Sequence, residues 1–480
     1  MGTEGMDDVA RKLYRRPDLF VKHCLGGHLW SKQVEIARSV ATHKKTAVAA
    51  CNGPGKSDVA AKLVLWWTFC RAPSMCITTA PTWSQVETIL WSYIGREYYK
   101  LPEEMQAVST LLNTRINIAP DHFAYGLSTD KPGKLQGRHH PHLLVVVDEA
   151  NEVPDSIMSV IGTLGSGGEY RELLIGNPVT SSGKFYNAFR NPELGYNTIT
   201  IDAFDTPNFT DEDCPEAVKA NLVTPASVAE WAAEWGEASP MYQSRVHAIF
   251  PDGDEDNVLC PLSWLLAAKR RALDTESYLP LTGTAQCGLD VARFGTDKTS
   301  FAGSVGHVLT EMDTLDGRTG TLEVVGWAAG KVRAYAAKHG TVTLLVDEGY
   351  NPGVYDLLRR TLSGEEAIPI RVRPVAFGGS AVDKVKHSNA RNEMMWGLRE
   401  LLRTGNNDAD MVIATTGPEV ERLCAQLSAM HFGYDSKGRP ALESKEEMKK
   451  RGMPSPDEAD AVALSQYRPK SSRFVGGRVE

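Results

Sequence analysis

A short glycine-bearing segment follows one apolar stretch and precedes another. Its residues are Ala50, Cys51, Asn52, Gly53, Pro54, Gly55, Lys56 and Ser57. The flanking patterns predict a strand at Thr46–Ala50 and a helix at Ser57–Phe69. In that setting Asn52, Gly53, Pro54 and Gly55 form a loop in which the backbone N–H groups of the non-proline residues, together with the helix N-terminus, bind phosphate oxygens. Lys56 can reach the β- and γ-phosphates and Ser57 can ligate Mg²⁺, although Ala50 stands where such loops usually have glycine.

A second apolar stretch, Leu143–Val147, ends at two consecutive carboxylates, Asp148 and Glu149. A continuous apolar run of this kind predicts a strand covered on both faces of a parallel sheet. Asp148 could hold Mg²⁺ through water, and Glu149 could polarise an attacking water. An acidic helix N-terminus would also explain the pair. Because both motifs occur in order, each at the end of an apolar strand, we predict an enzyme that binds and hydrolyses ATP.

Three further polar residues fit an ATP site, each with a plainer alternative. Gln33 lies upstream of the loop and could contact an adenine edge, or it is a surface glutamine. Arg138 could stabilise charge in the transition state, from its own or a neighbouring subunit, or it is a surface arginine. Asn177 follows an apolar strand and could sense the γ-phosphate, although a turn residue before Pro178 is the simpler interpretation.

Aspartates recur at the ends of elements in the second half of the chain. Asp290 lies in or at the end of a predicted strand, Ala285–Val291, and Asp347 follows another strand. Asp457 and Asp460 lie three residues apart at the start of a predicted helix, so one helix face carries both. Converging carboxylates repel one another, and two divalent cations, Mg²⁺ or Mn²⁺, would compensate them and clamp a phosphodiester. Unrelated strand-end and helix-cap acids are the alternative.

The order of elements indicates two α/β domains. Alternating strands and helices in residues 1–203 predict a P-loop ATPase domain with a mostly parallel sheet. A strand aspartate with a hairpin, a second strand aspartate and a late acidic helix give residues 281–469 the layout of an RNase-H-like (resolvase-type) nuclease. Another strand is predicted at Gly320–Trp327. Residues 204–280 are predicted as a linker or small subdomain, and 470–480 as a disordered tail.

Composition limits the class of protein further. The chain has 480 residues and a net charge of −8, so any contact with DNA must be local or must use metal ions. No apolar run reaches the roughly 18 residues that a membrane span needs, and no secretory signal is apparent. The eight cysteines form no CxxC pair, which argues against a zinc ribbon and favours a reducing cytoplasm.

Together these segments resemble the large subunit of tailed-bacteriophage terminases, over roughly residues 25–468. The matching segments are Trp30–Gln33, residues 50–57, Thr79–Thr82, Gln136–Arg138, Val147–Ala150, Gly176–Pro178, Gly288–Asp290, Val346–Asp347, Glu443–Lys445, Arg451–Gly452, Ser455–Asp457 and Asp460–Ala461. The stretch from Glu443 onward is the most family-specific of them.

The resemblance implies a motor that hydrolyses ATP to move double-stranded DNA through a portal protein into a procapsid, and that cuts concatemeric DNA. It implies that Arg138 is an arginine finger between subunits of a homo-oligomeric ring, and that Asn177 couples hydrolysis to movement. Asp290, Asp347 and Asp460 would carry the nuclease metals, with Asp457 assisting. A small terminase subunit as partner, the host cell cytoplasm as location, and transient residence on the procapsid but not in the mature virion follow from the same resemblance. A monomer in solution is compatible with it.

Two other functions share parts of this pattern. A helicase-like ATPase fused to a resolvase-type nuclease, acting in DNA repair, would have both sites, but it would need a second motor domain. An ATP-dependent assembly factor with a non-catalytic C-terminal fold would have only the first site. Metal-dependent DNA cleavage separates this last candidate from the other two.

Overall fold

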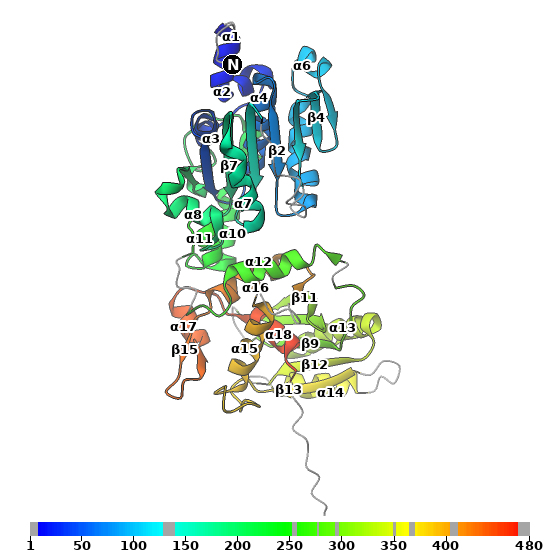
Figure 1. The fold of residues 1–480 in the computed structure, drawn as a ribbon. Helices are drawn as coiled ribbons and strands as arrows, with labels where there is room; N and C mark the ends of the chain where they lie inside the picture. The colour runs from blue at the N-terminus through cyan, green and yellow to red at the C-terminus, as the bar shows by residue number, and fades with distance from the viewer. Residues whose placement is uncertain are drawn as a thin grey trace, which may run out of the picture. The chain divides into compact units, whose positions relative to one another are not determined.

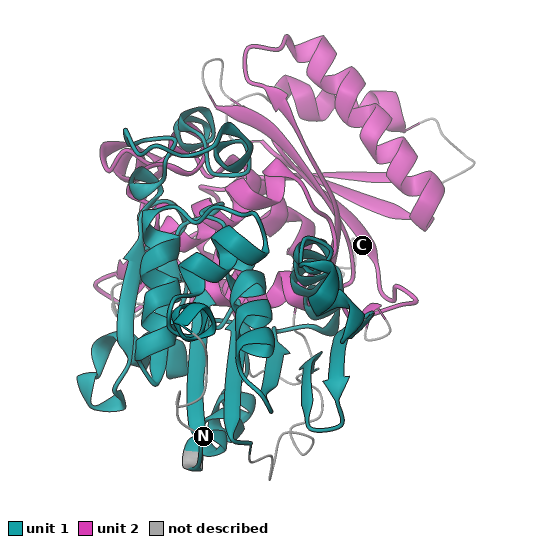
Figure 2. Cartoon of the chain, turned by 90° about the horizontal axis from the view of Figure 1, so that it is seen from above, with its two compact units in different colours: residues 1–230, 243–252 teal, residues 231–242, 253–480 magenta. Residues whose placement is uncertain are grey.

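The computed structural model describes residues 8–127, 140–251, 257–275, 278–292, 297–348, 352–363, 370–403 and 411–468. The chain divides into two units, drawn in Figures 1 and 2. Unit 1 comprises residues 1–230 with 243–252, and unit 2 comprises residues 231–242 with 253–480. The interval 204–280 thus contributes to both units, and the boundaries at 203 and 280 stay predictions. The predicted tail, 470–480, lies outside the described residues.

Unit 1 is built on an eight-stranded sheet with the order β3-β4-β5-β2-β6-β7-β1-β8. Strands from β5 to β8 in this order run parallel, whereas β3, β4 and β5 pair antiparallel. The strands are β1 Lys45–Ala50, β2 Met75–Thr79, β3 Thr110–Leu112, β4 Arg115–Ala119, β5 His122–Gly126, β6 His142–Asp148, β7 Glu169–Gly176 and β8 Asn197–Ile201. The mostly parallel sheet predicted for this half is confirmed.

Helix α4, Lys56–Cys70, packs against the centre of this sheet and contacts β2, β5 and β6. All its residues from Val59 to Thr68 are buried, as expected for a helix that is apolar all round. The helix predicted at Ser57–Phe69 is therefore confirmed. The other helices are α1 Asp8–Arg15, α2 Pro17–Cys24, α3 Ser31–Thr42, α5 Trp91–Tyr98, α6 Glu103–Ala107, α7 Asp155–Thr163, α8 Gly183–Arg190, α9 Glu216–Lys219, and α10 Pro225–Trp235 and α11 Pro240–Arg245 where the chain passes between units.

Unit 2 contains a six-stranded sheet with the order β13-β12-β9-β10-β11-β14. Strands β9, β10 and β11 are successively antiparallel, and β12 and β13 continue the sheet parallel to β9. The strands are β9 Ala285–Asp290, β10 Lys298–Val305, β11 Val308–Asp316, β12 Val342–Asp347, β13 Ile370–Val375 and β14 Val412–Ile413. This is the RNase-H-like topology, so the predicted fold class of the second half is confirmed.

The strand predicted at Gly320–Trp327 is wrong, because these residues begin helix α13, Thr321–His339. The β-branched residues Val324 and Val325 favour a strand locally. However, the buried residues continue at helical spacing: Val324, Val325, Ala328, Ala329, Val332, Tyr335 and Ala336. This stripe packs against β9, β10 and β12, and burial along several turns outweighs the local preference.

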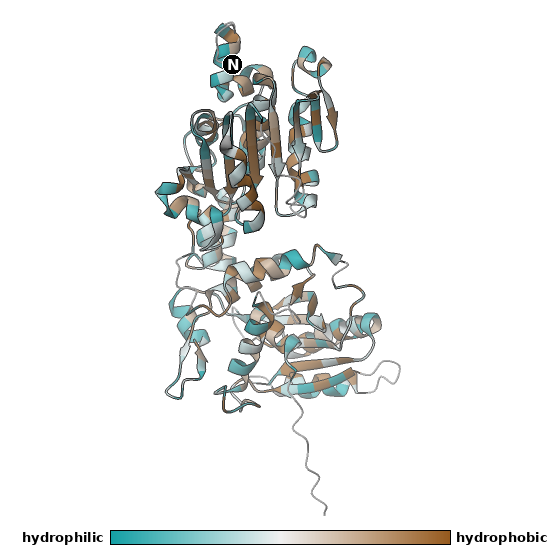
Figure 3. Ribbon diagram, in the orientation of Figure 1, coloured by the Kyte–Doolittle hydropathy of each residue, from teal (hydrophilic) through white to brown (hydrophobic). Residues whose placement is uncertain are grey.

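Helix α18, Asp457–Gln466, packs against β9 and β10 of the same sheet. Gly288 of β9 permits this approach, since a Cβ there would lie 2.1 Å from the carbonyl oxygen of Ala461. Apolar residues concentrate along the strands of both units (Figure 3). Within the described ranges, every helix is too short or too polar to span a membrane. The remaining elements are α12 Leu262–Arg271, α14 Pro352–Leu362, α15 Ala390–Leu402, α16 Pro418–Ala429, α17 Lys445–Lys450, β15 Phe432–Tyr434 and β16 Pro440–Leu442.

Candidate active sites

The glycine-bearing loop joins β1 to α4 as predicted. Gly53 and Gly55 have φ values of 68° and 84°, in the left-handed region that side chains disfavour. A Cβ at Gly55 would also lie 2.6 Å from Nε2 of Gln33, so a side chain there would displace Gln33 from the loop. These two glycines therefore set the loop so that the N-terminus of α4 opens at Lys56.

Lys56 joins the ends of three strands. Its Nζ donates to Oδ1 of Asn177 at 3.0 Å and to the carbonyl oxygen of Cys51 at 3.3 Å. It also lies 3.8 Å from Oε1 of Glu149. Asn177 is held in turn, because its Nδ2 donates to the carbonyl oxygen of Ala50 at 2.7 Å. The structure thus brings together the lysine, the asparagine and the glutamate that the sequence predicted at separate strand ends.

Ser57 and Asp148 form the second contact of this site. The Ser57 hydroxyl donates to Oδ2 of Asp148 at 3.0 Å. Burial raises the pKa of Asp148 to about 6, and the neighbouring Glu149 carboxylate adds to the rise. Glu149 has a φ of 46°, a backbone conformation that is rare outside glycine and concentrates at functional sites. A hydroxyl and a carboxylate side by side are the hard oxygen donors that Mg²⁺ prefers.

Gln33 lies directly against the loop. Its Nε2 donates to the carbonyl oxygen of Gly55 at 3.1 Å, and the Trp30 indole donates to that of Pro54 at 3.3 Å. The Oε1 of Gln33 is buried without a hydrogen-bond partner among the described residues. Arg138, by contrast, lies outside the described residues, so its predicted role stays a prediction.

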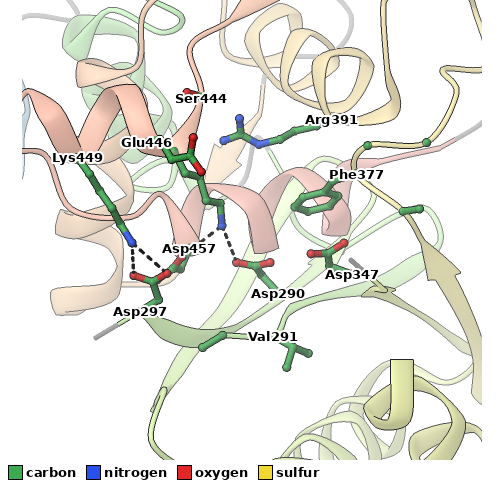
Figure 4. Close-up of a pocket in the computed structure, with 15 residues that line it drawn as sticks. Asp290, Val291, Asp297, Asp347, Phe377, Arg391, Ser444, Glu446, Lys449 and Asp457 are labelled. Carbon is green, nitrogen blue, oxygen red and sulfur yellow. Dashed lines mark hydrogen bonds and ion pairs between the residues drawn. The ribbon is translucent and has the colours of Figure 1, made fainter. Parts of the chain in front are cut away.

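The second site is a cavity of about 640 Å³ in unit 2, lined by Asp290, Asp347 and Asp457 (Figure 4). Asp290 ends β9 and Asp347 ends β12, and these strands are adjacent and parallel, with Leu289 paired to Val346. Asp457 is the first residue of α18, which lies across the same sheet. The three aspartates that the sequence placed on separate elements therefore face one cavity.

Asp460 is placed differently from the other three. Its side chain is fully buried and does not line the cavity. Its Oδ1 accepts from Nε of Arg391 at 3.0 Å, and its Oδ2 lies 2.8 Å from Nζ of Lys445. Burial would raise the pKa of Asp460, but these two cations outweigh burial and lower it. Its predicted metal role stays a prediction, and Asp457 has the more open position.

Lys445 belongs to this site, although the sequence indicated no role for it. Its Nζ lies 3.5 Å from Asp290 and 3.4 Å from Asp457, besides its contact with Asp460. Burial opposes charging of this ammonium, yet the three carboxylates outweigh burial and raise its pKa. Burial also raises the pKa of Asp290 well above its ordinary value, despite the opposing effect of Lys445. The sequence feature that could have indicated Lys445 is its position on the short helix α17, just before the acidic start of α18.

The donor set of this cavity fits a hard divalent cation, because Asp290, Asp347 and Asp457 all offer carboxylate oxygens, while Asp297, which also lines it, is paired with Lys449. In the ranges that the structure describes, no three carboxylate, imidazole or thiol groups already stand at metal-ligand spacing. The Lys445 ammonium lies among the carboxylates and neutralises part of the charge that a cation would neutralise. The site is therefore acidic, partly compensated, and open to solvent through the cavity.

Comparison with known proteins identifies relatives among phage proteins. No family model matches the chain. A curated relative, the "Probable terminase, large subunit" of Enterobacteria phage P7, is 23% identical, with 92% of this chain and 89% of the relative aligned. The chain is similar to a phage large terminase subunit over nearly its whole length. This confirms the predicted resemblance.

Solved structures of phage large terminase proteins also match the chain, with low TM-scores. The nuclease domain of the large terminase subunit gp2 of bacterial virus Sf6 is 21% identical, with a TM-score of 0.37 over 44% of this chain and 100% of that chain. The large terminase ATPase domain of Thermus phage P74-26 is 20% identical, with a TM-score of 0.37 over 49% of this chain and 99% of that one. The large terminase of a thermophilic bacteriophage is 11% identical, with a TM-score of 0.38 over 95% and 97% of the two chains.

Proposed function

We propose that this protein is the large subunit of a viral DNA-packaging motor, an ATPase and a metal-dependent endodeoxyribonuclease in one chain. One observation carries the proposal: unit 1 gathers Lys56, Asn177 and Glu149 at a phosphate-type loop, and unit 2 gathers three aspartates around one cavity. The similarity to the phage P7 protein spans both units.

In unit 1 the residues gathered around the glycine-bearing loop have separate roles in ATP hydrolysis. Lys56 exchanges its contacts with Asn177 and Glu149 for the β- and γ-phosphates. Ser57 and Asp148 would hold Mg²⁺, which offsets phosphate charge when bound. Glu149 orients the attacking water and accepts its proton, while Asn177, released by Lys56, reports the state of the γ-phosphate to β1 through Ala50. Arg138 supplies positive charge from a neighbouring subunit.

In unit 2 the clustered aspartates form the site of DNA cleavage. Asp290, Asp347 and Asp457, with Asp460 behind them, would hold Mg²⁺ or Mn²⁺, which polarises the phosphodiester and lowers the pKa of water when bound. Lys445 keeps three of these carboxylates, those of Asp290, Asp457 and Asp460, together before the metal arrives. Arg391 fixes Asp460 and thereby the first turn of α18.

The partners follow from this activity. Double-stranded DNA is the substrate of both units, moved by one and cut by the other. A portal protein and a small terminase subunit place the motor on the procapsid, where copies of the chain form a ring, and a monomer persists in solution. The work takes place in the host cell cytoplasm, with transient attachment to the procapsid and absence from the mature virion.

The test separates the two activities in the full-length chain. Lys56→Ala should lower ATP hydrolysis at least a hundredfold, because a positioned phosphate contact is worth several kcal/mol of barrier, and it should leave Mn²⁺-dependent plasmid nicking intact. Asp347→Ala should abolish nicking and preserve hydrolysis. DNA uptake into procapsids, measured as protection from added DNase, should need Lys56. Nicking that survives Asp347→Ala, or hydrolysis that survives Lys56→Ala, would refute the assignment of the site concerned.

A further inference from the structure

A loop between β13 and α15, residues 376–389, starts in the wall of the nuclease cavity and returns to it. Phe377 and Gly379 line the cavity, and Phe377 is labelled beside Asp347 in Figure 4. The returning chain closes on them, since N–H of Arg391 donates to the carbonyl oxygen of Phe377 at 3.1 Å and N–H of Ala390 to that of Gly379 at 2.9 Å. The ten residues between Gly379 and Ala390 therefore project from the edge of the site.

This 376–389 loop has a fixed shape. The Glu393 carboxylate of α15 accepts the N–H groups of Val382 and Asp383 at 2.8 and 3.0 Å. Glu393 is itself held by the Tyr467 hydroxyl at 3.0 Å. Oδ1 of Asp383 then accepts the N–H groups of Val385 and Lys386 at 3.2 and 3.1 Å. Since two carboxylates, one in the loop and one on α15, hold four of its N–H groups, the exposed side chains around Val385 are displayed on a fixed backbone.

The side chains displayed by the loop are cationic and apolar. Val385 is 86% exposed between Lys384 and Lys386, and Val382 is 53% exposed. Residues 376–389 contain Lys384 and Lys386 against a single acid, Asp383, which lies 3.4 Å from Nζ of Lys386, in a chain whose net charge is −8. From the β15–β16 hairpin, Nη1 of Arg439 donates to the Lys384 carbonyl oxygen at 3.3 Å and holds the loop, while its own charge is paired with Asp435.

The reach of the loop matches the DNA on either side of a bond being cut. Ten residues with joined ends extend no further than about five residues, or about 17 Å, from the cavity. A DNA strand places a phosphate about every 3.4 Å along the helix axis, so the loop can lie over roughly five base pairs beside the cleaved phosphodiester. Lysines bind such phosphates without regard to sequence, and apolar side chains at minor grooves contact sugars and base steps.

We propose that the 376–389 loop positions double-stranded DNA for the nuclease: Lys384 and Lys386 bind backbone phosphates beside the scissile bond, and Val385 rests against the duplex groove. This role rests on the nuclease activity proposed above. The loop gives an acidic cavity the local positive surface that a polyanion needs for its approach.

The experiment removes the two lysines from the full-length chain as K384A/K386A. A matched control, K338A/R360A, removes two exposed cations from the last turns of α13 and α14, which lie at the end of β12 opposite Asp347. DNA affinity is measured on a 40-base-pair duplex across a salt series, with every variant in the D347A background. K384A/K386A should weaken binding roughly tenfold and lower the salt slope by up to about 1.8, and the control should change neither.

Cleavage assays distinguish loss of DNA binding by the loop from damage to the nuclease site itself. Without D347A, K384A/K386A should raise the plasmid concentration needed for half-maximal nicking, whereas hydrolysis of bis(p-nitrophenyl) phosphate, too small to reach the loop, should be unchanged. V385D should impair nicking further, and V385A less. An unchanged salt slope in K384A/K386A, or equal loss of both hydrolytic activities, would overturn the loop's role. Failure of the unaltered chain to nick plasmid would instead overturn the proposed nuclease, while the binding series still decides what the loop does.

Discussion

Glu169 in unit 1 and Asp290 in unit 2 are both carboxylates at strand ends, and both are largely shielded from water, yet their neighbours differ in sign. Glu169 is surrounded by donors: Tyr14 at 2.5 Å, His142 at 2.9 Å, Arg71 at 3.1 Å and Arg171 at 3.3 Å. Burial raises the pKa of Glu169, but the donors outweigh burial and hold it well below its usual range. Asp290 faces further aspartates, and its pKa is raised.

The difference separates a structural cluster from a functional one. Both oxygens of the Glu169 carboxylate accept from donors. Arg71 is packed 3.9–4.2 Å from the ring centroids of Tyr14, Trp66 and Trp67. That arrangement ties α1, α4 and the sheet together, and the Glu169 carboxylate is compensated by cations. Around Asp290 the acids outnumber the cations, so the folded chain stores repulsion that a divalent cation would relieve.

The largest expected effect is on the structural cluster. Glu169→Gln should destabilise unit 1 by about 3–5 kcal/mol at pH 7, because the buried Arg71 loses its counter-charge. Because the pKa of Glu169 is lower in the folded than in the unfolded chain, its ionised carboxylate stabilises the fold at pH values above 4.5, the unfolded value. This stabilisation is lost progressively as the pH falls below 4.5 toward the folded pKa. The gap in calorimetric unfolding temperature between variant and parent should therefore narrow below about pH 4.5.

The control for this variant is Glu193→Gln, an exposed carboxylate in the same unit, which should be neutral within about 0.5 kcal/mol. A gap for Glu169→Gln that stays constant from pH 7 to pH 3 would contradict the charge argument and point to packing alone.

The same contrast decides what the sequence could predict. The positions of Asp148 and Glu149 were predictable because they lie at the end of a strand that the hydrophobic pattern marks, and those of Lys56 and Ser57 because they open the helix after a glycine-bearing loop. Asp290, Asp347 and Asp457 were predictable as strand-end and helix-start acids, and the parallel pairing of β9 with β12 brings the first two together. Lys445 and Arg391 were not, since they meet the aspartates only through tertiary packing of α17 and α15. The α13 error had the same origin, because packing against the sheet outweighed a local strand preference.

Removal of a carboxylate from the cluster around Asp290 should raise stability, whereas removal of the Glu169 carboxylate should lower it. Asp290→Asn should stabilise the metal-free chain by about 1–3 kcal/mol, because it removes a buried carboxylate that the folded state disfavours. The transition of unit 2 should rise by about 2–4 °C per kcal/mol, while plasmid nicking is lost. A raised pKa means that the parent gains stability as the pH falls through the folded value, so the advantage of the variant should be largest near pH 8 and shrink in acid.

Asp356→Asn, an exposed position on α14, is the matched control and should shift the transition by less than about 1 °C. Addition of Mn²⁺ sharpens the comparison: it should stabilise the parent more than Asp290→Asn, because only the parent keeps the full set of carboxylates. A lower unfolding temperature for metal-free Asp290→Asn would show that Lys445 compensates Asp290 completely and that no repulsion is stored there.

The smallest expected effect extends the comparison to a neutral group. The buried Oε1 of Gln33 lacks a partner among the described residues, whereas its Nε2 is bound to Gly55, so this amide is half satisfied and can accept one more donor. The exocyclic amine of adenine is such a donor, and guanine presents a carbonyl oxygen at the same position. Gln33→Ala should therefore lower the preference for ATP over GTP, measured as the ratio of kcat/KM values, about fivefold, which corresponds to one hydrogen bond of about 1 kcal/mol. The ratio is the decisive quantity, because loss of the Gly55 contact would loosen the loop and impair both nucleotides equally. If both KM values rise and the ratio stays constant, Gln33 shapes the phosphate loop and does not read the base.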